Sequence, residues 1–255
     1  MFPSAFIGHG SPINAIEDND YTQAWRNLGK SLPKPSAIMV ISAHWFTGAC
    51  KITYHDWPKT IYDFYGFPKD LNQISYPAPG HPELAKEIIS NLAEFNIIPD
   101  THWGFDHGTW TVLKHIFPLA DIPVIQLSID FTKPLKWHLE LAQKLKFLRE
   151  KNVFILGSGN IVHNLSMARI SSTIEPYPWA KEFDEKVADI LKNKDYNKLL
   201  DYTKITKTAT IAIPTLDHFI PLIYVVGLAE EKEEADFICK GISFKSISMR
   251  SFVMV

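Results

Sequence analysis

The sequence predicts an α/β fold: a single domain with a central, mainly parallel but mixed β-sheet, helices on both faces, and the active site at the carboxyl-terminal rim of the strands. Short apolar, often β-branched runs are typical of buried strands, and amphipathic helical patterns lie between them. The alternation of the two predicts parallel strands joined by helices, because such crossovers return each strand in the same direction. The strand-like runs occupy residues 3–7, 37–42, 123–128, 153–156 and 209–213.

The clearest helical patterns cover residues 81–95, 135–150 and 179–192, where apolar side chains recur every three or four positions. Residues 51–55 and the C-terminal segment 246–255 predict further strands, the latter antiparallel or at an edge of the sheet. With 255 residues and a hydrophobic content of 46%, the chain is expected to form one domain over residues 1–255.

Two segments without a regular pattern also support specific expectations. Residues 55–80 are rich in proline, glycine and aromatic side chains, which predicts a long ordered loop that shapes a site. The acidic run at residues 227–237 is expected to form the solvated end of a helix.

Charge and cysteine content narrow the class of partner. The 26 basic and 28 acidic residues give a net charge of −2, which offers no attractive surface for nucleic acid or an anionic membrane. The partner is therefore expected to be a small molecule. Cys50 and Cys239 lie far apart and outside any CxxC pair, which excludes a disulfide scaffold and a cysteine zinc site. With no signal-peptide pattern and no long apolar run, we expect a cytoplasmic protein that does not enter a membrane.

Four histidines each follow a predicted strand. Neutral imidazole is a ligand for iron, zinc, copper and nickel, and the carboxyl ends of strands meet at one rim of an α/β sheet. The sequence therefore predicts one divalent metal site built from these four residues, His9, His44, His163 and His218. An isolated histidine is more often structural, and we assign that role to His55, His81, His102, His115 and His138.

His107 lies in the segment WGFDHGTW, residues 103–110. Asp106 and Thr109 are candidate caps for the helix that follows, so His107 has a structural interpretation. The flanking aromatic side chains equally suggest the wall of a pocket that stacks on a flat ring. The residues alone leave both interpretations open.

Eight motifs, which run from residue 8 to residue 253, resemble those of the LigB-superfamily extradiol ring-cleavage dioxygenases, specifically the 4,5-DOPA dioxygenase group. They are GHGSP at 8–12, ISAHW at 41–45, YDFYGFP at 62–68, YPAPG at 76–80, GFDHGTW at 104–110, GSGNIVHNL at 157–165, PTLDHFIPL at 214–222 and SISMRSFV at 246–253.

The resemblance implies an enzyme that opens a catechol ring with O2 at a mononuclear metal. It implies that His9 and His44 bind the metal and that His163 is an acid/base that also reaches it. It further implies that His107 contacts substrate or dioxygen, and that the segment of His218 supplies the third ligand, with neighbouring Asp217 as the alternative. Candidate substrate contacts are Trp45, Asp63, Tyr65 and Trp110, of which Asp63 would meet the ammonium group of an amino-acid side arm.

The resemblance also implies one divalent metal ion per chain. We expect Fe(II) in catalysis and Zn(II) in the purified protein, because an all-imidazole site keeps the full charge of the ion and zinc lies above iron(II) in the affinity order. Two other functions use the same residues: a zinc-dependent hydrolase, in which the metal activates water, and a non-enzymatic small-ligand binding protein on the same scaffold. Retention of all five histidines disfavours the binding protein.

Overall fold

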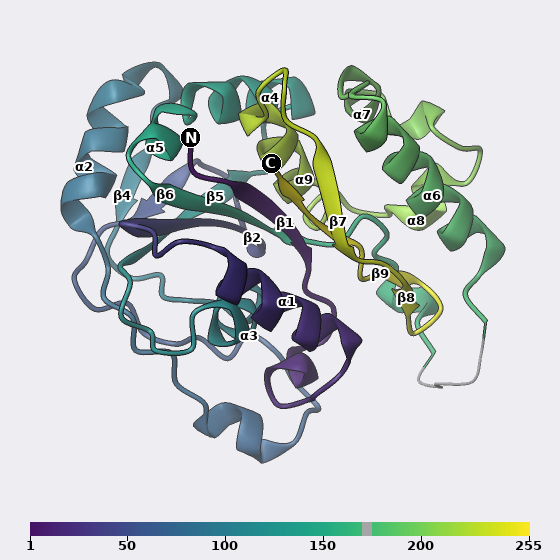
Figure 1. Cartoon of the computed structure of the whole chain (residues 1–255), viewed down its shortest axis with the longest axis horizontal. Helices are drawn as coiled ribbons and strands as arrows, with labels where there is room; N and C mark the ends of the chain where they lie inside the picture. Colours follow the sequence, from purple (N-terminus) through teal and green to yellow (C-terminus); the bar gives the residue numbers. More distant parts are fainter. Residues whose placement is uncertain (170–174) are drawn as a thin grey trace.

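The computed structural model describes residues 1–169 and 175–255, and places an eight-stranded sheet between two layers of helices (Figure 1). The order of the strands across the sheet is β4-β3-β5-β2-β6-β1-β10-β7, and a separate two-stranded sheet pairs β8 with β9. The strands are β1 (Ser4–Gly8), β2 (Ala37–Thr47), β3 (Lys51–Thr53), β4 (Ile98–Asp100), β5 (Val124–Asp130), β6 (Val153–Gly159), β7 (Ala235–Cys239), β8 (Ile242–Ser243), β9 (Ile247–Ser248) and β10 (Ser251–Met254).

The helices fall between the strands largely where the apolar periodicity predicts them. The α-helices are α1 (Asp20–Ser31), α2 (Pro82–Asn91), α3 (His107–Ile116), α4 (Leu135–Lys144), α5 (Phe147–Glu150), α6 (Pro178–Lys192), α7 (Asn197–Leu200), α8 (Ala209–Ala212) and α9 (Ile220–Leu228). Short 3-10 helices lie at Pro12–Ala15, Lys69–Gln73, Ala93–Phe95, Leu165–Met167 and Tyr202–Lys204. None of the described helices is long and apolar enough to cross a membrane.

The centre of the sheet is a parallel quartet, β5-β2-β6-β1, in which every strand is fully or mostly buried. The C-terminal strand β10 joins β1 antiparallel, and β7 continues that edge. On the other side β3 pairs antiparallel with β5. The predicted mixed, mainly parallel sheet and the antiparallel C-terminal strand are therefore confirmed.

Two apolar cores cover the two faces of the sheet. Helices α1 and α3 pack on one face and bury the large side chains Trp25 and Trp110. Helices α2, α4, α6 and α9 pack on the other face (Figure 1). Helix α9 is buried along its whole length, which explains its apolar sequence, IPLIYVVGL, on every side.

The predicted strand at residues 209–213 is wrong, because this segment forms the short helix α8. Ala209, Ala212 and Ile213 are buried whereas Thr210 and Ile211 face solvent, which is the spacing of a helix and not of a strand. A five-residue apolar run is compatible with either structure, and only the packing of α8 against α6 decides between them. The predicted loop at residues 55–80 is confirmed, apart from the 3-10 turn at Lys69–Gln73.

The acidic run at residues 227–237 is only partly a solvated helix end. Helix α9 ends at Leu228, β7 begins at Ala235, and Glu233 between them is 8% exposed. Glu233 accepts two hydrogen bonds from the guanidinium of Arg149, which is fully buried and also donates to the carbonyls of Phe2 and Leu228. The ion pair thus ties the N-terminus, α5 and α9 together behind the sheet.

We predict that Glu233→Gln lowers the free energy of unfolding by about 3 kcal/mol, because it leaves the buried Arg149 charge unpaired. Urea denaturation measures the loss, and Glu231→Gln at an exposed neighbouring position is the control, with an expected change within about 0.5 kcal/mol.

Burial raises the pKa of Glu233, but hydrogen bonds from Arg149 more than offset this and hold it below its usual value. The stabilisation is therefore present at neutral pH and is lost as the pH falls below about 4.3. A loss equal to that of the control would contradict the pairing.

Candidate metal centre

Three of the predicted histidines lie at the rim where β1, β2 and β6 end. His9 directly follows β1, and His163 lies four residues beyond β6. His44, expected just after a strand, lies inside the longer strand β2. The correction has a clear structural cause: the register between β2 and β5 shifts between Ile41 and Phe46, so β2 bulges at this point. A bulge re-aims side chains, and here it directs His44 toward His9.

His218 reaches the same rim from a different kind of element. It lies in the turn between α8 and α9, and not after a strand as expected. Its carbonyl oxygen accepts a hydrogen bond from the backbone of Asn160, at the end of β6. A Cβ on Gly159 would lie 2.2 Å from that carbonyl oxygen, so only glycine permits this approach. Gly159 therefore makes room for His218, and Gly157 on the same strand makes room for Pro221, whose carbonyl oxygen would lie 2.5 Å from a Cβ at that position.

His107 is the first residue of α3, and Asp106 caps that helix by accepting from the backbone N–H of Thr109. Capping by Asp106 is thus confirmed, and His107 also joins the cluster of histidines. A Cβ on Gly108 would lie 2.7 Å from Ser42 Oγ and 2.9 Å from His44 Cδ2, so this glycine lets the helix pack directly on the bulge of β2. Asp106 accepts a further hydrogen bond from Ser42, which fixes the helix to the same strand.

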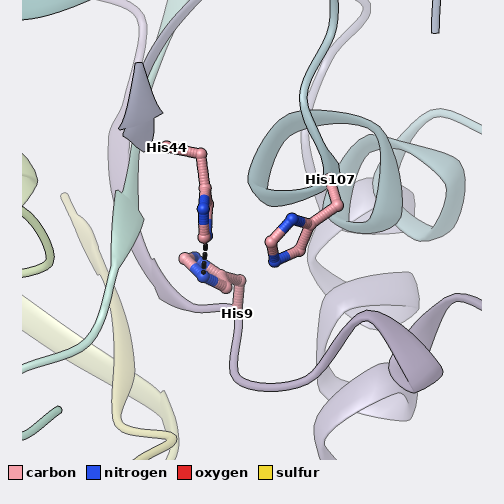
Figure 2. Close-up of side chains that lie close together, drawn as sticks. All are labelled: His9, His44 and His107. Atoms are coloured by element: carbon pink, nitrogen blue, oxygen red, sulfur yellow. Dashed lines mark hydrogen bonds between the residues drawn. The ribbon is translucent and has the colours of Figure 1, made fainter. Parts of the chain in front are cut away.

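Five imidazoles meet in this way from five separate parts of the chain. Figure 2 shows the His107 ring pointing toward the pair formed by His9 and His44. The Nε2 atoms of His9 and His44 lie 3.0 Å apart, and the His218 ring centroid lies 5.3 Å from that of His9 and 5.1 Å from that of His44. His163 stacks on His218 with a centroid distance of 3.4 Å.

A hydroxyl group holds His9 from behind. Ser158 Oγ lies 3.0 Å from His9 Nδ1 and donates its own proton to the carbonyl of Gly108. Because the hydroxyl proton is used, Ser158 accepts from His9, which places the proton on Nδ1 and leaves the Nε2 lone pair free. The same serine links His9 to the first turn of α3.

Carboxylates hold three of the other imidazoles. Asp217 Oδ2 lies 2.7 Å from Nδ1 of His218. Asp63 Oδ2 lies 2.9 Å from Nδ1 of His107 and 3.3 Å from Nδ1 of His44. A carboxylate accepts, so the hydrogen bonds to His218 and His107 place the proton of these two rings on Nδ1 and leave Nε2 free. Of the two candidates for the third ligand, His218 lines the cavity with the other histidines, and Asp217 holds its Nδ1.

The electrostatics keep three of the imidazoles, those of His9, His44 and His163, neutral. Burial, followed by the neighbouring histidines, lowers the pKa of His9 and of His44 well below the ordinary value. Burial and the adjacent His218 lower the pKa of His163 to about 2. Burial raises the pKa of Asp217, but its hydrogen bond with His218 outweighs this and holds the pKa below the usual range. At neutral pH these three rings therefore present unprotonated nitrogens, as a divalent cation requires, and Asp217 is ionised.

The spacing of the nitrogens also fits a metal ion. With metal–nitrogen bonds of about 2.0 to 2.1 Å, two imidazoles on one ion have their nitrogens roughly 3 to 3.4 Å apart. The 3.0 Å between His9 and His44 lies in that range. Candidate ligand atoms of His9, His44 and His107 all lie within 4.8 Å of one another, as do those of His163, Asp217 and His218. The histidines of these two separate sets of donors line the same cavity.

The histidines form the floor of a cavity of about 520 Å³. Its walls are mostly apolar and come from the loop at residues 55–80, the segment after β6, and the β8–β9 sheet. The wall side chains include Phe64, Tyr65, Phe67, Leu165, Ala168, Phe244 and Ile247. Of these, Tyr65 is 93% exposed and Leu165 is 68% exposed, which places both at the mouth.

Among the predicted substrate contacts, Asp63 and Tyr65 line the cavity and the two tryptophans do not. Trp45 is 4% exposed and stacks on Trp103 at 5.3 Å, behind the bulge of β2. Trp110 is fully buried and donates to the carbonyl of Ile61, which anchors the base of the loop. Both tryptophans therefore support the wall from behind, since the alternation along β2 and the periodicity of α3 turn them into the core.

Sequence reasoning missed several residues of the site. Ser158 lies inside a quoted motif, but only the fold brings it to His9 across 149 positions. Leu165 and Phe244 carry no pattern that distinguishes a cavity wall from a core. The double use of Asp63 was also missed, because the sequence does not reveal that its loop folds back onto α3.

Comparison with known proteins gives consistent results. Residues 4–254 match the family model described as the catalytic LigB subunit of aromatic ring-opening dioxygenase. The chain is 44% identical over 253 residues to an Escherichia coli K12 protein named 4,5-DOPA dioxygenase extradiol, covering 98% of this chain and 93% of that protein. A Beta vulgaris protein of the same name is 38% identical, with coverage of 91% and 89%. A crystal structure of an uncharacterized E. coli K12 protein superimposes with a TM-score of 0.88 at 40% identity, over all of both chains.

We predict that His44→Ala reduces bound iron or zinc from about one ion per chain to a small fraction, because it removes one of two nitrogens placed 3.0 Å apart. Elemental analysis after loading and desalting measures the content. His102→Ala, at an exposed histidine, is the matched control and should retain the metal. Equal metal content in the two variants would rule out His44 as a ligand.

Proposed function

The chain belongs to the LigB family of aromatic ring-opening dioxygenases, and we propose that its residues 1–255 form one catalytic domain that cleaves a catechol such as L-DOPA at a centre formed by His9, His44 and His218. The enzyme is an extradiol dioxygenase, an oxidoreductase that places both atoms of O2 in the ring-opened product. One observation supports the proposed site: the rings of His9, His44 and His218 lie with centroids 5.0 to 5.3 Å apart, and all three line one apolar cavity.

In the proposed centre His9, His44 and His218 would hold one divalent ion, and His163 stacks on the His218 ring with a centroid distance of 3.4 Å. The bound ion would supply a common anchor for the two catechol oxygens and dioxygen and, as Fe(II), a path for electrons between them. We expect Fe(II) in the active enzyme and Zn(II) in protein purified without control of metal, since nitrogen sites prefer zinc to iron(II).

His163 is the proposed acid/base. Burial and the adjacent His218 keep the free imidazole unprotonated at neutral pH, so a lone pair is available, whereas the nearby charge of Asp217 raises its pKa and favours proton uptake. A catechol hydroxyl that reaches the floor of the cavity gives its proton to this nitrogen, and Asp217, beneath the stacked pair, stabilises the resulting charge. The proton is returned when the ring opens.

His107 has a different environment and a different proposed role. Its Nδ1–H donates to Asp63 while its ring faces His9 and His44, so its other nitrogen accepts a hydrogen bond from substrate or orients dioxygen beside the metal (Figure 2).

The walls suit a flat ring. Phe64 and Ile247 both present apolar surface to the cavity, and Tyr65 at the mouth is placed to cover the side arm of a bound catechol. Such walls exclude water from the reacting ring, which strengthens the polar contacts at the floor. A zinc hydrolase and a ligand-binding protein are both disfavoured by membership of a family of oxygen-dependent enzymes.

We predict that protein loaded anaerobically with Fe(II) consumes one O2 for each catechol and forms a yellow ring-opened product. An oxygen electrode and an absorbance trace measure the two together over a panel of catechols that includes L-DOPA. Protein loaded with zinc should be inactive, since zinc does not change its oxidation state. The absence of oxygen uptake with every catechol would reject the proposed function.

We predict that His163→Gln lowers turnover by about 10²- to 10⁴-fold, because the positioned base is lost while an amide of similar size fills its place. Single-turnover oxygen uptake measures the change, and metal analysis runs alongside it. Unchanged metal with reduced turnover assigns His163 to proton transfer, whereas a parallel loss of metal makes it a ligand.

A further inference from the structure

Asp63 has more contacts within the site than a substrate anchor needs. Its Oδ1 accepts from the backbone N–H of His107 at 2.8 Å, and its Oδ2 accepts from Nδ1 of the same residue at 2.9 Å. The same Oδ2 lies 3.3 Å from Nδ1 of His44. One carboxylate therefore serves a residue of β2 and the first residue of α3 at once.

The lone pairs of Asp63 are partly used by these contacts. A carboxylate offers about four acceptor sites, and the backbone N–H and the Nδ1–H of His107 occupy two of them, while the His44 ring lies 3.3 Å from the same Oδ2. The side chain is only 19% exposed. An ammonium group would have to bind in the remaining space while the carboxylate stays hydrogen-bonded to His107 and close to His44.

Asp63 also connects the wall of the cavity to its floor. The next residue, Phe64, packs edge-on against the His107 ring with centroids 5.7 Å apart, and Tyr65 and Phe67 continue the wall. The loop at residues 55–80 is thus attached to the histidines through the carboxylate of Asp63, beside the side chains that face the substrate.

We propose that Asp63 is a positioning residue, which orients His44 and His107 and holds both with the proton on Nδ1, and that it is not the anchor for a substrate ammonium group. Only the kinetic part of this inference, the effect on catechol cleavage, rests on the proposed function. The carboxylate links the loop at residues 55–80 to the proposed metal ligand His44 and to His107. Its loss should therefore lower metal affinity and turnover for every catechol alike.

Asp63→Asn tests the proposal because an amide cannot reproduce these contacts. The NH2 group of asparagine can only donate hydrogen bonds. In either orientation of the amide it would therefore face at least one N–H group that now donates to Asp63. To avoid this, an imidazole must move its proton from Nδ1 to Nε2, and the protonated Nε2 can no longer bind a metal. Asp70→Asn, at an exposed position on the same loop, makes the same change of charge and is the matched control.

Three measurements are made on each protein. The first is zinc affinity by competition with a chromogenic chelator, and the second is the tautomer of each histidine from two-dimensional NMR of protein with ¹⁵N-labelled imidazoles. The third is kcat and KM of the Fe(II) enzyme with L-DOPA and with 3-(3,4-dihydroxyphenyl)propionate, which lacks only the amino group.

For Asp63→Asn we expect zinc affinity and kcat to fall by about 10- to 100-fold, as for other residues that hold a metal ligand. The loss of kcat should be the same for both catechols, with the ratio of their KM values unchanged. The NMR spectrum should show at least one histidine moving from the Nδ1–H to the Nε2–H form. Asp70→Asn should match the unaltered protein in all three measurements.

A selective rise in KM for L-DOPA, with normal zinc affinity and normal tautomers, would overturn the proposal and make Asp63 the ammonium anchor. If Asp63→Asn does not fold, Asp63→Glu, which keeps the charge but displaces the carboxylate, is measured in the same way and should lower kcat equally for both catechols. If no catechol is cleaved by the unaltered enzyme, the proposed function fails, while zinc affinity and NMR still decide the role of Asp63.

Discussion

The hydrogen bond that holds Nδ1 of His9, His107 and His218 is the interaction on which the rest of the site depends. Neutral histidine has two tautomers, and only a proton held on Nδ1 leaves Nε2 free for a cation. Ser158, Asp63 and Asp217 accept at these three nitrogens, and Asp63 also lies 3.3 Å from Nδ1 of His44. Without these acceptors the same rings, buried and close together, would have no fixed orientation. Two of the three acceptors are carboxylates, so they also offset the charge that a divalent ion brings into an otherwise uncharged floor.

The fold makes this arrangement possible by bringing backbones unusually close. The bulge of β2 turns His44 out of the alternation of its strand, and Gly108 lets α3 approach it. Gly159 does the same for the turn that carries His218. The bulge and the two glycines lie at the end of the parallel strands β5-β2-β6-β1. The interior of these strands is fully buried, so the sheet is rigid where it positions the histidines.

The loop at residues 55–80 contributes both to the wall that would contact the substrate and to the support of the histidines. It supplies the aromatic wall through Phe64, Tyr65 and Phe67, and through Asp63 it reaches the histidines of the floor. Trp110, predicted to face the substrate, instead anchors the loop through the carbonyl of Ile61. A change in the wall is therefore transmitted to the floor by a few short contacts and without any rearrangement of the sheet.

Much of this protein was determined by its sequence. The apolar runs of β1, β2, β5 and β6 are buried on both faces, so local composition identifies them, and the motifs around His9, His44, His107, His163 and His218 identify the family. Tertiary structure decided the remainder. Residues 209–213 became a helix through packing against α6, the tryptophans Trp45 and Trp110 turned into the core, and Asp63 met two histidines from other elements. The physical reason is the same in each case: a local pattern reports the tendency of a segment to be buried, whereas the neighbour that a side chain meets depends on contacts between residues far apart in the chain.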